Sequence, residues 1–78
     1  MAYALVRKMK DGTIKAYGAS AGMSPWHQDP TRIWKIKSED KAHEKGFMLN
    51  ASVVPFEEAV SQMAQLSGVM VAHPDMIL

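Results

Sequence analysis

The sequence predicts a small α+β domain, with a small antiparallel sheet packed by one amphipathic helix and by a second, short helix. Three observations carry this prediction. A hairpin pattern occupies the first 17 residues, a strand-like alternation follows at residues 32–37, and residues 55–68 repeat apolar side chains at helical spacing. At 78 residues, the chain is expected to form one domain, residues 1–78, with a modest core.

The hairpin is predicted from residues 3–9 and 13–17, which flank the tripeptide Lys10-Asp11-Gly12. This tripeptide suits a three-residue loop in which Gly12 takes the left-handed conformation. The resulting register places Val6 opposite Ala16. A two-residue turn would instead pair Lys8 with Lys15, which costs a little free energy because the charges are alike.

The middle of the chain is predicted to hold a long loop, a third strand and a short helix. Residues 18–30 are rich in Gly, Ser, Pro and Asp, which favours a loop containing Trp26. In the strand at residues 32–37, we expect Trp34 and Ile36 to be buried on one face. Ser38 can cap a helix that runs to about residue 45 and ends at Gly46.

The amphipathic helix at residues 55–68 has a start signal and an apolar face. Pro55 suits the first helical position, and Glu57 and Glu58 place negative charge beside the positive end of the helix. Residues 47–54 are expected to be partly extended, and residues 69–73 to form the last strand of the sheet. The apolar face is predicted to consist of Phe56, Ala59, Val60, Met63 and Leu66.

Composition narrows the classes of function. The chain has no cysteine, which excludes disulfides, thiolate metal sites and a thiol nucleophile. It shows neither a signal-peptide core nor an apolar run of membrane-spanning length, so we expect a cytoplasmic protein that does not enter a membrane. No sequence pattern indicates a cofactor.

Enzyme chemistry is a third-ranked hypothesis, as a small hydrolase or a metal-dependent enzyme. Residues 18–22 match the G-x-S-x-G pattern of a serine nucleophile, here Ser20, but Pro25 follows at once where that motif needs a helix. We therefore interpret this segment as a small-residue loop, with phosphate binding by its backbone left open. Two His-x-Asp pairs have spacing that could chelate a metal, although both lie in turn-like sequence: His27 with Asp29, and His73 with Asp75.

Nucleic-acid binding, as an accessory protein, is the second hypothesis. Sheets hold single strands by combining aromatic stacking with phosphate contacts. The isoelectric point of about 8.1 is low for a dedicated nucleic-acid binder. The residues expected to share one sheet face for this purpose are Lys8, Lys15, Tyr17, Trp34, Lys35 and Lys37.

The leading hypothesis is a non-enzymatic protein-binding module, of the regulatory or inhibitory type that small phage and bacterial proteins represent. Seven methionines suit adaptable contact surfaces, and several apolar residues occupy positions that a monomer would normally expose. All nine cationic residues precede Gly46, an asymmetry that suits packing of the two halves of one chain or, together with the apolar C-terminus and an open sheet edge, pairing with a second copy as a homodimer. The expected contact residues are Met23, Trp26, Met76, Ile77 and Leu78.

Overall fold

The predicted hairpin forms the centre of the sheet in the computed structural model, which describes residues 1–19 and 24–67. Strands β1 (Tyr3–Lys8) and β2 (Ile14–Tyr17) pair in antiparallel orientation. Gly12 has a φ of 90°, and its N–H donates to the Met9 carbonyl at 3.0 Å. The three-residue loop with a left-handed glycine is therefore confirmed.

The hairpin register agrees with the prediction, because Val6 lies opposite Ala16. The same register places Arg7 opposite Lys15, so a like-charge pair is present after all. Avoiding such a pair therefore does not explain the choice of turn. The left-handed conformation of Gly12 explains it better, since few other residues adopt a positive φ without strain.

Two further strands extend the hairpin to a four-stranded antiparallel sheet in the order β3-β2-β1-β4. Strand β4 (Ser52–Pro55) pairs with β1, and strand β3 (Trp26–His27) pairs with β2. The prediction that Trp26 lies in a loop was wrong, because its backbone pairs with Tyr17 at the edge of the sheet.

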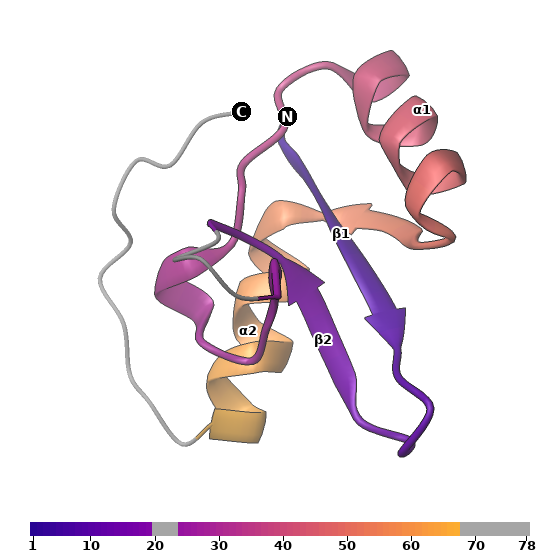
Figure 1. Ribbon diagram of the computed structural model, residues 1–78. Helices are drawn as coiled ribbons and strands as arrows, with labels where there is room; N and C mark the ends of the chain where they lie inside the picture. Colours follow the sequence, from indigo (N-terminus) through magenta and orange to yellow (C-terminus); the bar gives the residue numbers. More distant parts are fainter. Residues whose placement is uncertain (20–23, 68–78) are drawn as a thin grey trace.

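Helices pack on both faces of this sheet, which confirms the α+β class (Figure 1). Neighbouring residues of a strand point to opposite faces, so Ala4 and Leu5 enter two separate core clusters. Helix α2 (Phe56–Ser67) contributes to the cluster around Ala4, and the 3₁₀ turn η1 (Pro30–Arg32) contacts α2. Helix α1 (Glu39–Leu49) contributes to the cluster around Leu5.

Helix α1 begins as predicted but continues beyond its predicted end. The Ser38 hydroxyl accepts a hydrogen bond from the Lys41 N–H at 3.3 Å, which caps the helix. Gly46 does not end the helix. A Cβ atom at Gly46 would lie 3.1 Å from Cγ2 of Val53, so the glycine lets α1 approach the sheet closely, and Asn50 ends the helix with a φ of 54°.

Helix α2 begins one residue later than predicted, at Phe56. Pro55 is the last residue of β4 and lies opposite Tyr3. Phe56, Ala59 and Met63 are buried and Val60 packs against them, as expected of the apolar face. Leu66 is the exception, since 53% of its surface is exposed.

The predicted third strand forms no regular strand among the described residues and pairs through isolated bridges, such as Gly18 with Ile33 and Tyr3 with Ile36. Its buried residues are Ile33 and Ile36, whereas Trp34 is only half-buried. The two isoleucines enter different core clusters, because this segment crosses the end of the sheet between the two helical layers. The strand predicted at residues 69–73 lies outside the described residues.

Across the described ranges 1–19 and 24–67, no helix has the length and apolar character needed to cross a bilayer.

Candidate functional site

Alternation along the strands gathers aromatic and cationic side chains on the sheet face that carries α1. Arg7 on β1, Lys15 and Tyr17 on β2, and Trp26 on β3 all point to this face, since they are register partners or lie two residues apart. Helix α1 contacts β1 and β4, at the other side of the face. Together with Lys45 of α1, these four residues form what we call the aromatic–basic surface.

Two aromatic rings form the centre of this surface. Tyr17 and Trp26 face each other across β2 and β3, with ring centroids 5.7 Å apart and an angle of 60° between the ring planes. This edge-to-face arrangement is a favourable one for aromatic pairs. Both side chains remain partly exposed, so solvent or a ligand can reach them.

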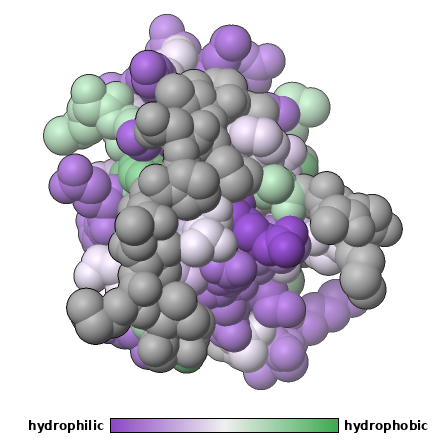
Figure 2. Space-filling view, turned by 90° about the vertical axis from the view of Figure 1, so that its left-hand side faces the viewer, coloured by the Kyte–Doolittle hydropathy of each residue, from purple (hydrophilic) through white to green (hydrophobic). Residues whose placement is uncertain are grey.

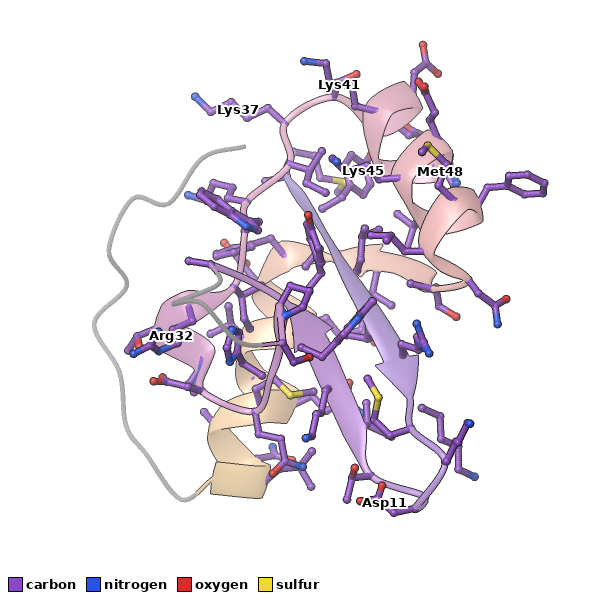
Figure 3. All side chains as sticks on the ribbon, in the orientation of Figure 1. Asp11, Arg32, Lys37, Lys41, Lys45 and Met48 are labelled. Carbon is purple, nitrogen blue, oxygen red and sulfur yellow. The ribbon has the colours of Figure 1, made fainter. Side chains whose placement is uncertain are left out.

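Cations lie over both rings. The guanidinium carbon of Arg7 is 5.2 Å from the centroid of the Trp26 ring, and Nζ of Lys45 is 5.8 Å from that of Tyr17. Arg7 also donates through Nη1 to the Leu49 carbonyl at 3.2 Å, which anchors it to the end of α1. Figure 3 shows Lys45 on the side of α1 that faces the strands.

Within the described part of the chain, Arg7, Lys15 and Lys45 form no ion pair with a carboxylate, although Lys15 is near enough to Asp11 to help lower the pKa of that carboxyl group. Several acidic side chains have partners elsewhere. Asp29 pairs with Arg32, with 3.5 Å between Oδ2 and Nε, and Glu39 accepts a hydrogen bond from the Tyr3 hydroxyl. The surface can therefore attract an anionic ligand.

The six residues predicted to share a face for nucleic-acid binding are divided between two faces. Lys8 precedes the hairpin loop on the face opposite Lys15, since its register partner is Ile14 of the α2 cluster. Lys35 and Lys37 line a cavity of about 780 Å³ beside Phe56, also on the α2 side. The predicted common face was wrong for these three lysines.

Trp34 is placed beside Tyr17, as its N–H donates to the Tyr17 carbonyl at 3.1 Å. Its neighbour Ile33 packs in the α2 cluster, and Ile36 packs in the α1 cluster. Alternation along this extended segment therefore puts Trp34 on the face of the aromatic–basic surface. The structure thus brings Lys15, Tyr17 and Trp34 to one face. Arg7 and Lys45 also lie there, and the sequence analysis placed neither of them on this face.

Of the residues predicted to contact a protein partner, only Trp26 lies within the described residues, where it is half-buried in β3. Met23, Met76, Ile77 and Leu78 lie outside them. The sequence analysis missed two exposed apolar residues of α1, Phe47 at 89% and Met48 at 74% exposure. The sequence did contain a signal for this exposure. The apolar residues of this helix do not line up on one face, so they cannot all reach the core.

The residues considered for catalysis and metal binding gain no support from the described geometry. His27 donates through Nε2 to the Ala19 carbonyl at 2.7 Å, and Oδ1 of Asp29 accepts from Thr31 at 2.6 Å. Within residues 1–19 and 24–67, no three His, Cys, Asp or Glu side chains are grouped to hold a metal ion. Ser20 and the pair His73 and Asp75 lie outside the described residues.

Comparison with known proteins adds no further assignment, since no protein-family model, no curated protein and no solved structure matches this chain.

Proposed function

We propose that the protein is a non-enzymatic binding module whose aromatic–basic surface binds single-stranded nucleic acid. The observation that carries this proposal is the pairing of two accessible aromatic rings with three cations that form no ion pair within the described residues. Bases stack on aromatic rings, and phosphates bind lysine and arginine. A sheet face that offers both kinds of group suits a flexible single strand.

A single strand suits this surface better than a duplex. The bases of a duplex are stacked inside and cannot lie on Tyr17 or Trp26, whereas an unpaired strand can turn its bases toward the rings. Because the surface has three cations, electrostatic attraction should make a modest contribution to the binding free energy. If each contacts one phosphate, the logarithm of the binding constant should fall with the logarithm of salt concentration with a slope of about −2.

The test is fluorescence anisotropy with a labelled single strand of about ten nucleotides, over a range of salt concentrations. We expect binding that weakens with salt, and a loss of about fivefold or more for Trp26→Ala, since stacking on an aromatic ring contributes about 1–3 kcal/mol per base. Lys15→Ala should lower the salt slope, whereas Lys8→Ala is the matched control on the opposite face. Equal effects of the two lysine variants, or no binding at low salt, would contradict the proposal.

A protein partner is the second candidate function, and the exposure of Phe47 and Met48 favours it. On α1, Asp40 and Glu44 form one charged row and Lys41 and Lys45 form the next, so a second copy related by a two-fold axis could pair opposite charges. Figure 2 shows another side of the molecule, where the described surface is largely hydrophilic with small separate hydrophobic patches. The exposure of Phe47 and Met48 on α1 makes these two residues the candidates for a dimer contact.

Light scattering over a wide range of protein concentrations tests the dimer. We expect the mass of two chains at high concentration, and a shift toward one chain in the variant Phe47→Ser with Met48→Ser. Because both side chains are exposed in one chain, the variant should melt at nearly the same temperature as the original protein. The mass of a single chain at every concentration would contradict this candidate.

A further inference from the structure

The two rings of the aromatic–basic surface are inclined to each other, and this limits which single strands can use both. Their planes make an angle of 60°, with centroids 5.7 Å apart. Backbone pairing of Tyr17 with Trp26 fixes the two positions, and the cations over the rings further restrict their movement. The rings thus form a pair of surfaces at a steep angle.

Neighbouring bases that stack on each other are nearly parallel, with a rise of roughly 3.4 Å per nucleotide. If one base lies flat on the face of Trp26 that Arg7 does not cover, and the next on the face of Tyr17 that Lys45 does not cover, their planes must differ by about the 60° between the rings. Two bases at that angle cannot stack on each other. A strand that uses both rings must therefore break the stacking between two adjacent bases, and the cost depends on how strongly those bases stack.

We propose that the aromatic–basic surface selects single strands with weak internal stacking, so that pyrimidine-rich strands bind more tightly than adenine-rich strands of equal length. This inference rests on the proposed function. Runs of adenine stack strongly and lose that energy on binding, whereas thymine and uracil runs are flexible and lose little. The selection acts through stacking strength and needs no hydrogen bonds to base edges.

The side chains around the rings fit this mechanism. Arg7, Lys15 and Lys45 are cations suited to phosphate, which carries no sequence information. Gln28 follows Trp26 and His27 in the chain, but its amide nitrogen already donates to the Ile14 carbonyl at 3.3 Å. The residues that define the surface therefore supply stacking and charge rather than a set of base-reading amides.

The experiment compares labelled oligothymidine and oligoadenosine DNA, each of about ten nucleotides, at one salt concentration. We expect the thymidine strand to bind roughly threefold to tenfold more tightly. An abasic strand of the same length measures the contribution of phosphates alone, and it should bind more weakly than either. In Tyr17→Leu, which retains an apolar side chain but removes the second ring, the preference should fall toward equal affinity, whereas Tyr17→Phe should retain it.

The outcomes separate this inference from the proposed function. If both strands bind more tightly than the abasic strand but with equal affinity, the surface binds single strands and the selection for weak stacking is wrong. If the original protein prefers thymidine and Tyr17→Leu retains that preference with an unchanged melting temperature, the inclined ring pair is not its cause. If none of the three strands binds, both the function and the selection are wrong.

Discussion

Arg7 lies over the indole ring of Trp26, with its guanidinium carbon 5.2 Å from the ring centroid. The two residues come from strands that do not pair with each other, because β2 lies between β1 and β3. The same guanidinium donates to the Leu49 carbonyl, the last of α1. The Arg7 side chain thus connects the central strand β1 with the edge strand β3 and with the end of α1. It also places a positive charge at the end of a helix that has no basic residue in its own last turn.

Replacing Arg7 should therefore destabilise the fold as well as weaken ligand binding. Arg7→Ala removes a charged hydrogen bond and the contact with Trp26, and we expect the free energy of unfolding to fall by about 1–3 kcal/mol. Arg7→Lys keeps the charge but lacks the planar guanidinium, so it should recover only part of the loss. Urea denaturation measures both changes. Equal stability of Arg7→Ala and the original protein would contradict this role.

The sequence was sufficient to predict the fold class, because local patterns encode its largest parts. The turn at Gly12, the cap at Ser38 and the buried face of α2 each depend on residues close together in the chain. Strand β3 could not be predicted in this way. Its two residues, Trp26 and His27, are strand only because β2 offers them an edge to pair with.

The candidate site was harder to predict than the fold. That Tyr17 and Lys15 share a sheet face could be predicted because strand alternation is visible in the sequence, but Lys45 reaches Tyr17 from a helix about 30 residues away in the chain. Lys35 was assigned to the same face by its type and period, yet its ammonium lies 5.1 Å from the ring centroid of Phe56 on the α2 side. Only the tertiary arrangement decides which lysines meet which rings.

Gly18 is expected to tolerate no side chain. A Cβ atom there would overlap the Arg32 carbonyl oxygen, a backbone atom that cannot move aside easily. Gly18→Ala should therefore disrupt the bridge between Gly18 and Ile33 and lower the melting temperature strongly. Gly12→Ala is the matched control, since its φ of 90° is strained but the space around it is open, with an expected cost of about 1–2 kcal/mol. A smaller loss for Gly18→Ala than for Gly12→Ala would refute the steric argument.

Asn50 is the only residue other than glycine with a positive φ among those described, at 54°. Glycine adopts this left-handed conformation without the penalty of a Cβ atom, so Asn50→Gly should keep or slightly raise the stability. Asn50→Val should lower it by about 1–2 kcal/mol or more, because a β-branched side chain is strongly disfavoured there. Thermal melts of the two variants test this order. The reverse order would mean that the side chain of Asn50, rather than its backbone, stabilises the end of α1.

Two Asp-x-Thr turns should make the stability sensitive to acid. Hydrogen bonds from Thr13 to Asp11 and from Thr31 to Asp29 lower the pKa of each carboxyl group in the folded protein. A carboxyl group whose pKa is lower in the folded than in the unfolded state stabilises the fold at pH values above its unfolded pKa of about 3.9. This stabilisation is lost as the pH falls from there through the pKa of the folded state. We expect the melting temperature of the double variant Asp11→Asn with Asp29→Asn to fall less steeply below about pH 4 than that of the original protein. Parallel curves would contradict this.

Met63 and Leu66 provide a test of which residues of α2 form the core. Both belong to the apolar face expected from the sequence, but Met63 is fully buried and Leu66 is 53% exposed. Met63→Ala should leave a cavity beside Ala4, Ala16 and Ile33 and cost about 2–5 kcal/mol. Leu66→Ala removes a side chain of similar size and should cost much less, since alanine also favours the helix. Chemical denaturation of the two variants measures the difference, and a loss for Leu66→Ala as large as that for Met63→Ala would mean that the apolar face continues to the end of the helix.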